Sequence, residues 1–195
     1  MPVMCGRIIQ SGGPFRYAIV DGMNARDSRV HNYPPRWNGA PSQELLVIRR
    51  NHKTGVVSLD ALRWGLIPNW CSDPKGGRKP INAKCETVRD LPTFRDAYRT
   101  RRCIVPVDGF FEWKAIKGQK AKQPYAIAMK DGRRSGLRAF GRTGKSRRLA
   151  NGFVLLRSSP PMPTDSLPKS MTACRSYWRR VIAPPGSARS RIRVA

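Results

Sequence analysis

Apolar residues along the chain occur in short runs that are separated by clusters of Gly, Pro, Asn and Asp. Runs of this length, bounded by turn-forming residues, are typical of β-strands. The pattern predicts strands at four segments: 45–48, 56–64, 102–113 and 125–129. We therefore expect a core that is built mainly from β-sheet.

One segment has helical spacing instead. Phe94, Ala97 and Tyr98 follow Pro92 at intervals that place them on one face of a short helix over 93–102. The rest of this segment is basic, with Arg95, Arg99, Arg101 and Arg102. These arginines form either a solvated face or a surface that contacts phosphate groups, and the sequence leaves both interpretations open.

Length and charge divide the chain into a body and a tail. The 195 residues, 39% of them hydrophobic, suffice for one domain with a substantial core. The net charge of +26 is typical of a protein that binds a polyanion such as nucleic acid. Residues 137–195 hold 13 Lys or Arg against the single acid Asp165, and their Ser and Pro clusters show little periodicity. This tail is predicted to be disordered.

The five cysteines, at positions 5, 71, 85, 103 and 174, show no Cys-x-x-Cys spacing and follow no secretory segment. No apolar run reaches the ~18 residues of a membrane span. We therefore expect a reduced, cytoplasmic protein that does not enter a membrane. We also expect a monomer, which would be nucleoid-associated in a bacterium. A zinc site from Cys71, Cys85, Cys103 and a histidine lacks the usual ligand spacing, so no metal or cofactor is expected.

Met4 and Cys5 raise a first chemical hypothesis. Cleavage ahead of Cys5, or translation that starts at Met4, would leave Cys5 as the amino terminus. Such a residue carries an α-amine and a thiol that are both expected to be partly in their reactive forms at neutral pH, and together they condense with an aldehyde. The alternative is a buried cysteine with a structural role only.

Three further segments carry residues suited to chemistry. Asn82 belongs to a compact polar segment after a Gly-rich stretch, a position typical of a site on a loop or strand end. Glu112 follows an apolar strand among aromatic residues, where a carboxyl group suits proton transfer, although a solvent-facing strand position would also explain it. Trp64 and Trp70 flank a turn, and they either stack on an unpaired base or pack in the core.

Taken together, these segments resemble the SRAP family, the SOS-response-associated peptidases or abasic-site processing proteins. They occur in the order typical of that family: Cys5-Gly6-Arg7, 34–43, 64–70, 82–87 and 102–113. The resemblance covers roughly residues 4–132. It implies an α+β fold with a β-rich, mixed, barrel-like sheet in a single domain, which we place at residues 4–136.

The resemblance also implies a mechanism. In the family, self-processing exposes an N-terminal cysteine, which condenses with the ring-opened aldehyde of an abasic site in single-stranded DNA to form a thiazolidine. Cys5 matches that nucleophile, Asn82 matches the asparagine that positions it, and Glu112 matches the acid–base carboxylate. Contacts with the DNA are expected at Arg7, Asn38, Trp64, Lys84 and Trp113. The family usually has arginine at the position of Lys84, which puts bidentate phosphate contact there in doubt.

The C-terminal part departs from the family. The family has a histidine in an Ile-His-Asp-Arg-Met-Pro-like segment that acts as a general acid–base group, and this chain has none there. Residues 171–179, back-translated and read one nucleotide earlier, permit His-Asp-Arg-Met-Pro-Val-Ile-Leu-Ala. The segments 138–145 and 150–156 likewise permit family-like strings. We hypothesise a gained, lost or misread nucleotide between about Gly132 and Leu137, which resequencing would decide.

Such a shift has two expected consequences. The last strands of the sheet and the histidine would be lost together, so the domain would be incomplete and the literal chain would fold marginally. The missing acid–base group would lower the rate by on the order of a hundredfold to ten-thousandfold.

Two other classes of function remain open. A thiol peptidase that acts on other proteins would need a histidine base near Cys5, and only His31 or His52 could supply it. An inactive family remnant, or a non-catalytic basic protein that binds nucleic acid, would account for the altered tail.

Overall fold

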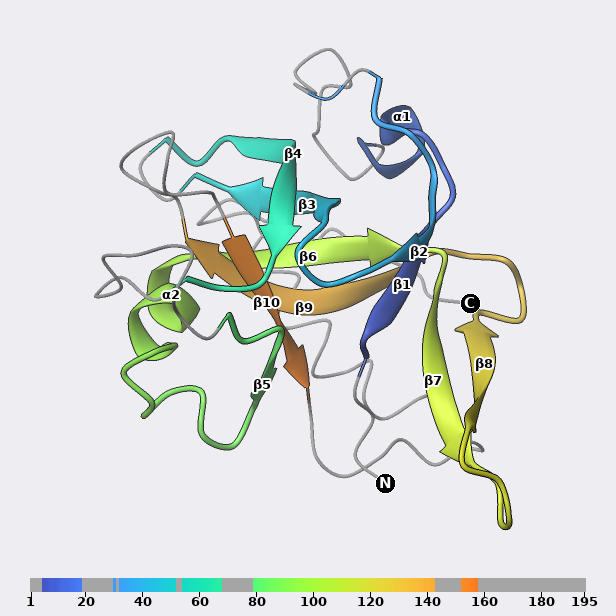
Figure 1. Ribbon diagram of the computed structural model, residues 1–195. Coiled ribbons are helices and arrows are strands. Elements are labelled where there is room, and N and C mark those ends of the chain that lie inside the picture. The colour runs from blue at the N-terminus through green and yellow to red at the C-terminus, as the bar shows by residue number, and fades with distance from the viewer. Residues whose placement is uncertain are drawn as a thin grey trace.

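The computed structural model describes residues 5–18, 30, 32–51, 54–67, 79–142 and 152–157. These ranges contain two short helices and ten strands (Figure 1). The helices are α1 (Pro14–Ala18) and α2 (Arg95–Thr100). The strands are β1 (Arg7–Gln10), β2 (Arg36–Gly39), β3 (Glu44–Arg50), β4 (Val57–Trp64), β5 (Asn82–Lys84), β6 (Arg102–Val107), β7 (Gly109–Ala115), β8 (Lys122–Ala128), β9 (Ser135–Arg142) and β10 (Gly152–Arg157).

The strands form two sheets. The smaller sheet has the order β2-β1-β7-β8, and its neighbouring strands are antiparallel. The larger sheet has the order β4-β3-β6-β9-β10-β5, and an additional parallel pairing of β10 with β4 closes five of these strands into a barrel. The predicted β-rich, barrel-like α+β fold is therefore confirmed.

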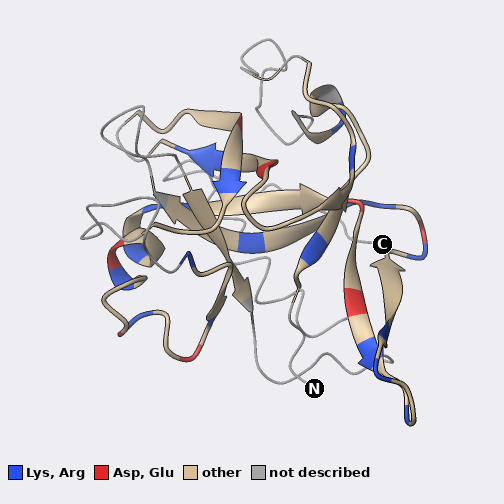
Figure 2. Cartoon of the chain, in the orientation of Figure 1, with Lys and Arg blue, Asp and Glu red and all other residues tan. Residues whose placement is uncertain are grey.

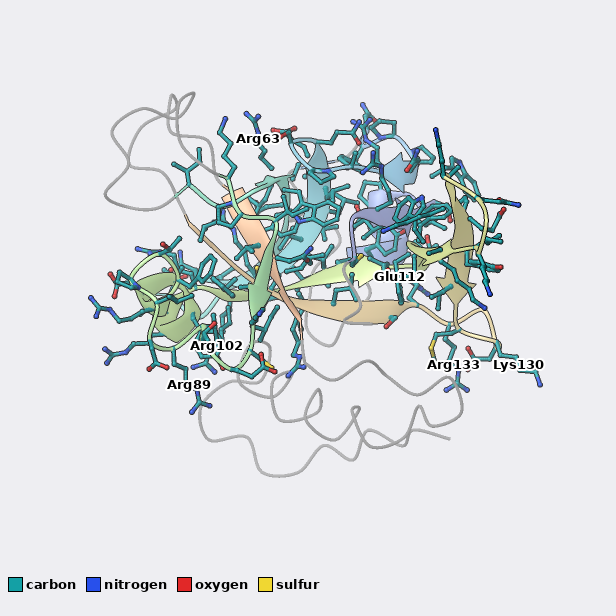
Figure 3. The ribbon with its side chains drawn as sticks, turned by 60° about the horizontal axis from the view of Figure 1, so that its bottom comes forward. Arg63, Arg89, Arg102, Glu112, Lys130 and Arg133 are labelled. Carbon is teal, nitrogen blue, oxygen red and sulfur yellow. The ribbon has the colours of Figure 1, made fainter. Side chains whose placement is uncertain are left out.

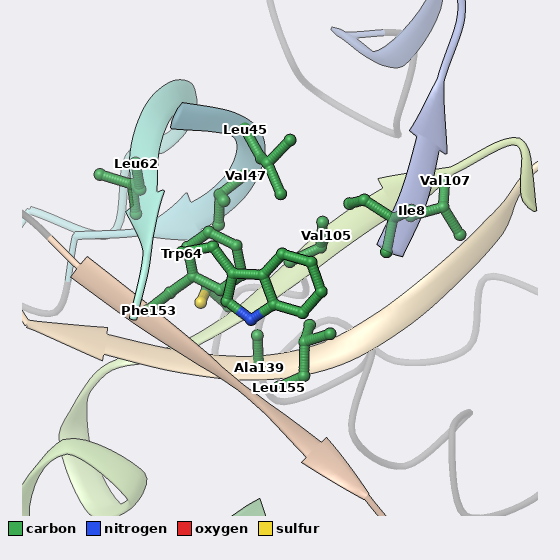
Figure 4. Close-up of a cluster of buried hydrophobic side chains, with 11 residues drawn as sticks. Ile8, Leu45, Val47, Leu62, Trp64, Val105, Val107, Ala139, Phe153 and Leu155 are labelled. Atoms are coloured by element: carbon green, nitrogen blue, oxygen red, sulfur yellow. The ribbon is translucent and has the colours of Figure 1, made fainter. Parts of the chain in front are cut away.

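Apolar side chains from strands that are distant in the sequence fill the barrel (Figure 4). Trp64 of β4 is fully buried and stacks on Phe153 of β10, with 6.3 Å between the ring centroids. Outside the barrel, Phe94 and Tyr98 from α2 and its start pack edge-on against Phe140 of β9, at 5.7 and 5.8 Å. Burial of apolar surface is the main favourable contribution to a fold of this kind, and these large rings are part of it.

Gln10 joins the two sheets. Its Nε2 donates to the carbonyl oxygens of Leu46 in β3 (2.9 Å) and Pro106 in β6 (2.7 Å), and its Oε1 accepts from the Leu46 backbone amide (2.9 Å). The side chain is fully buried, so these bonds replace the water that burial removes. β1, which directly follows the Cys5 segment, is thereby held against the barrel.

The predicted strands at 45–48, 56–64 and 125–129 correspond to β3, β4 and β8, and the predicted helix is confirmed over the shorter range of α2. The predicted single strand at 102–113 is wrong, because it is two strands that belong to different sheets. Asp108 lies between the two strands, where the chain turns. Its carboxylate accepts hydrogen bonds from Ser11 and Tyr17, which follow β1. No helix among the described residues is long and apolar enough to cross a membrane.

The expected loss of the C-terminal strands is wrong for two segments. β9 pairs with β6 and β10, and β10 closes the barrel, so the predicted domain boundary at residue 136 falls inside β9. The physical reason is that both segments carry apolar side chains that the fold buries: Ala139, Phe153 and Leu155 in the barrel cluster, and Phe140 and Val154 in the cluster with α2. The predicted disorder of the tail concerns residues 143–151 and 158–195, which lie outside the described residues.

Candidate functional site

Strands from both sheets bring the candidate catalytic residues together. β1 pairs antiparallel with β7, with Arg7 opposite Phe111, and this pairing places Cys5 within electrostatic reach of Glu112. β5 lies beside β10 at the edge of the barrel sheet, and its first residue is Asn82. Cys5, Asn82 and Glu112, which are far apart along the chain, therefore meet at one place.

Asn82 is bonded to the backbone of Cys5. Its Nδ2 donates to the Cys5 carbonyl oxygen at 3.0 Å, and its buried Oδ1 has no hydrogen-bond partner among the described residues. The preceding residue, Ile81, accepts a hydrogen bond from the indole Nε1 of Trp64 at 2.9 Å. The buried tryptophan thus fixes the start of β5 and, through it, the amide that holds the cysteine.

The Cys5 thiol lies in an environment that disfavours its ionised form. Burial, and then the negative charge of Glu112, raise its pKa to about 12, while a backbone hydrogen bond at Arg7 acts in the opposite direction. The expectation that this thiol is partly ionised at neutral pH is therefore wrong, because it assumed a solvated cysteine. The thiol needs a neighbouring base before it can react.

Glu112 lies in the middle of β7 and is half-buried (Figure 3). Tyr125 of β8 stands directly opposite it in the antiparallel pair and is 48% exposed. Residues opposite one another in such a pair lie on the same face, with Cβ atoms about 5 Å apart. Tyr125 is thus a neighbour of the candidate acid–base group that sequence patterns did not indicate, because only the pairing of β7 with β8 brings the two together.

The predicted DNA contacts lie at several places in the fold. Arg7 is half-buried in β1, and its Nη1 donates to the Gly6 carbonyl oxygen at 2.9 Å. Trp113 is 37% exposed on the same face as Arg7, which is the face opposite to Glu112. Asn38 in β2 and Lys84 at the end of β5 are both exposed. All four remain accessible to a ligand.

Trp64 does not fit its predicted role in DNA binding. Its side chain is fully buried, and its indole nitrogen is bonded to Ile81, so its ring presents no face to an unpaired base. The alternative of core packing is confirmed for this residue. Its predicted companion Trp70 and both histidines, His31 and His52, lie outside the described residues.

Asp108 is the centre of a polar network that sequence patterns missed. Its Oδ2 accepts hydrogen bonds from the Tyr17 hydroxyl (2.5 Å) and from the Ser11 hydroxyl and backbone amide (2.8 Å each). Burial acts to raise the pKa of this carboxyl group, but the bonds from Tyr17 and Ser11 outweigh it, so the pKa is lowered. The one signal in the sequence is an acidic residue that interrupts an apolar run.

The described ranges contain no group of three or more His, Cys, Asp or Glu side chains that could hold a metal ion. Of the cysteines weighed for a zinc site, Cys103 is buried in β6 and Cys85 bonds to Glu86 at 3.3 Å. Cys71 lies outside the described residues.

Fold and site together define a class of protein. A β-barrel holds a cysteine near the start of the chain, an asparagine bonded to the carbonyl group of that cysteine, and a glutamate whose charge raises the thiol pKa. The chemistry of these groups suits a nucleophile site, in which an amide and a carboxylate would support one thiol.

The chain belongs to the SOS response associated peptidase (SRAP) family, whose sequence model matches residues 4–152. It is similar to the abasic site processing protein YoaM of Bacillus subtilis, with 45% identity over 98 residues that cover 50% of this chain and 42% of that protein. It is also similar to the abasic site processing protein YedK of Escherichia coli, with 31% identity over 159 residues that cover 80% of this chain and 68% of that protein. The match therefore spans less than half the length of the Bacillus relative.

Solved structures show the same fold. A crystal structure of a phage-related protein from Bordetella bronchiseptica has a TM-score of 0.61 and 31% identity, covering 78% of this chain and 68% of that chain. A protein from Bacteroides thetaiotaomicron, 20% identical, has a TM-score of 0.61 over 79% of this chain and 68% of its own, and shares the fold alone. The family match extends beyond residue 136 and includes all of β9, in agreement with the place of that strand in the barrel.

Proposed function

We propose that the chain is an abasic-site processing protein that bonds covalently to single-stranded DNA through Cys5. The observation that carries the proposal is the hydrogen bond from Asn82 Nδ2 to the Cys5 carbonyl oxygen. It fixes the cysteine backbone and leaves the buried Asn82 Oδ1 as an acceptor for a further donor, such as the Cys5 amine. The names of the Bacillus and Escherichia relatives, both abasic site processing proteins, support the same function.

The chemistry begins with a free α-amine on Cys5. Hydrolysis of the Met4–Cys5 peptide bond consumes one water and releases that amine, which is the self-processing step. The amine adds to the aldehyde carbon of the ring-opened abasic sugar, and loss of one water gives an imine. The Cys5 sulfur then bonds to the imine carbon while the thiol proton is transferred to the nitrogen, which closes a thiazolidine ring.

The raised pKa of Cys5 favours one order of these steps. Because the thiol is protonated at neutral pH, the amine reacts first, and the Glu112 carboxylate then accepts the thiol proton and passes it to the nitrogen. The alternative of a peptidase that cuts other proteins would need a histidine base near Cys5, and both histidines lie outside the described residues.

The DNA partner would be held by groups on the strands that carry or adjoin Cys5, Asn82 and Glu112. Arg7 and Lys84 are assigned to phosphate groups, and Trp113 and Asn38 to the exposed bases or sugars. Aromatic stacking and phosphate contact of this kind suit an unpaired strand. We expect the protein to act on it as a monomer in the cytoplasm, without a cofactor.

The test is a single-stranded oligonucleotide that carries one abasic site, incubated with the purified protein and analysed on a denaturing gel. We expect a shifted, denaturation-resistant band, and mass spectrometry of the protein should find Cys5 at its amino terminus. Cys5→Ala should abolish the band, because it removes the thiol that closes the ring.

Cys85→Ser is the matched control, since it removes another half-buried thiol and should leave the band unchanged. An adduct that persists in Cys5→Ala, or that forms equally with an oligonucleotide whose bases are intact, would contradict the mechanism.

A further inference from the structure

A basic pocket lies on the far side of the barrel from Glu112. It has a volume of about 440 Å³ and is lined by residues of α2, of the turn after β5 and of the start of β6: Arg89, Arg95, Tyr98, Arg99 and Arg102. Figure 3 shows Arg89 and Arg102 close to each other at one end of the molecule and Glu112 toward the other. Figure 2 shows basic residues on α2 and on the segment before it, together with acidic ones.

The pocket is rigid on one side. The Arg102 Nε donates to the Tyr98 carbonyl oxygen at 3.0 Å, and its guanidinium group lies 5.5 Å from the centre of the Tyr98 ring. Tyr98 is itself packed edge-on against Phe140 of the barrel. A guanidinium group that is held in this way loses little conformational freedom when it binds an anion.

The positive charge of the pocket is only partly compensated. Arg95 forms an exposed ion pair with Asp96 at 3.7 Å. Neither Arg89 nor Arg99 has an acidic partner within the part of the chain that the structure describes, and both are exposed. Four arginines around one hollow repel one another, and an anion with several oxygens removes that repulsion and accepts their donors.

The pocket is connected to the Cys5 site by β5. This strand begins at Asn82, which is bonded to Cys5, and ends at Lys84, roughly 7 Å further on at the usual rise per residue. Lys84 is exposed, and its carbonyl oxygen accepts from the Val88 backbone amide, so a tight turn leads directly to Arg89. Two basic side chains, Lys84 and Arg89, therefore lie along the chain from the cysteine site to the pocket, with the acidic Glu86 in the turn between them.

We propose that this pocket binds phosphodiester groups of the same DNA strand whose abasic site is held at Cys5. The proposal rests on the proposed function for the identity of the strand. It assigns Arg89 and Arg99, with Arg95 and Arg102 beside them, to the DNA backbone on one side of the lesion. An oligonucleotide that is too short to extend beyond the Cys5 site would not reach the pocket.

The experiment compares the protein with Arg89→Ala/Arg99→Ala, measuring binding of intact-base single-stranded DNA by fluorescence anisotropy at ~50 and ~200 mM salt. Each phosphate contact on a single strand contributes about 0.7 to the slope of log affinity against log salt, so loss of two contacts should lower the slope by about 1.4. When the salt is lowered from ~200 to ~50 mM, the affinity of the variant should therefore rise about sevenfold less than the affinity of the original protein.

Length dependence locates the contact. An oligonucleotide of about four nucleotides should bind both proteins equally, whereas extension by about twelve nucleotides on the 5′ side or the 3′ side should reveal the difference on one side only. Lys130→Ala/Arg133→Ala is the matched control, because it removes two exposed charges from the turn between β8 and β9, away from the pocket.

An equal salt slope in the arginine variant and the control would overturn the proposal, as would an equal loss of affinity in both. These measurements need no covalent adduct, so they are separate from the crosslinking test. Crosslinking without a difference in salt slope would support the proposed function and reject the role of the pocket in DNA binding. A slope difference without crosslinking would support an anion site and reject the covalent function. If inorganic phosphate competes as well as the long oligonucleotide, the pocket binds a free anion and not the strand.

Discussion

Glu112 affects both the pKa of the Cys5 thiol and, as the proposed base, the rate at which Cys5 reacts. The charge of Glu112 is the second cause of the raised thiol pKa, after burial, so Glu112→Gln should lower that pKa toward its ordinary value. We expect alkylation of Cys5 by iodoacetamide, followed by peptide mass spectrometry, to proceed faster in this variant between about pH 8 and 10. The same variant should form adducts about a hundredfold more slowly, because the base is missing.

Glu44→Gln serves as the control for this pair of measurements, since it removes an exposed carboxylate from β3. Opposite changes in alkylation and adduct formation are the signature of a base that also raises the pKa of its partner. If both rates fell together, Glu112 would act through the fold and not through its charge.

Asn82 can be tested by removing its amide. Asn82→Ala deletes the hydrogen bond to the Cys5 carbonyl oxygen, so the cysteine is no longer held in place. We expect the rate of adduct formation to fall by roughly a hundredfold, as for other misplaced reacting groups, while affinity for intact-base DNA changes little. Gln123→Ala, on exposed β8, should change neither quantity. A loss of DNA affinity equal to the loss of rate would assign Asn82 to binding instead.

At the scale of elements, the junction of β6 and β7 depends on Asp108. Asp108→Asn should lower the free energy of unfolding by about 1–3 kcal/mol, because Tyr17 and Ser11 lose a charged acceptor. The folded-state pKa of Asp108 is lowered, so its contribution is present above the ordinary carboxyl pKa and is lost as the pH falls through the folded value. Urea denaturation at pH 7 and near pH 3 measures both effects.

The variant should lose less stability than the unchanged protein on acidification, because it has one fewer carboxylate to protonate. Asp131→Asn, in the exposed turn before β9, is a suitable comparison, since its ion pair with Arg133 is open to solvent. Equal acid sensitivity in the Asp108 variant and the unchanged protein would exclude the network as a source of pH dependence.

Helices and strands were predicted correctly where their apolar residues follow a regular spacing within one short segment. The buried run 45–48 and the helix after Pro92 needed only their own side chains to be recognised. β5 has three residues and β2 has four, too few for a periodicity, and both exist because neighbouring strands pair with them. The division of 102–113 also escaped prediction, because the groups that hold Asp108, on Ser11 and Tyr17, come from a distant segment near the start of the chain.

At the scale of the whole molecule, β10 closes the barrel. Phe153 is fully buried, stacks on Trp64 and accepts a hydrogen bond at its carbonyl oxygen from the Gly65 amide at 2.8 Å. Phe153→Ala should therefore lower the free energy of unfolding by about 3–5 kcal/mol, measured by urea denaturation. Trp37→Ala, at a ring that is 67% exposed, should change it by less than about 0.5 kcal/mol.

A small effect of Phe153→Ala would mean that β10 is not part of the folded barrel in solution. That result would favour the frame-shift hypothesis, in which residues after about 132–137 do not encode the natural strands. A large effect, together with a cooperative thermal transition of the 195-residue chain, would contradict the expected marginal folding.

Residue types and their order along the chain were sufficient to predict a β-rich domain, the family, and a candidate site at Cys5, Asn82 and Glu112, whose roles remain predictions. These features depend on local periodicity and on short motifs, which a linear sequence contains in full. The buried position of Trp64, the raised pKa of Cys5 and the meeting of Arg89 with α2 required the folded chain. Each depends on burial or on charges from distant segments, and these become defined only when the strands pair.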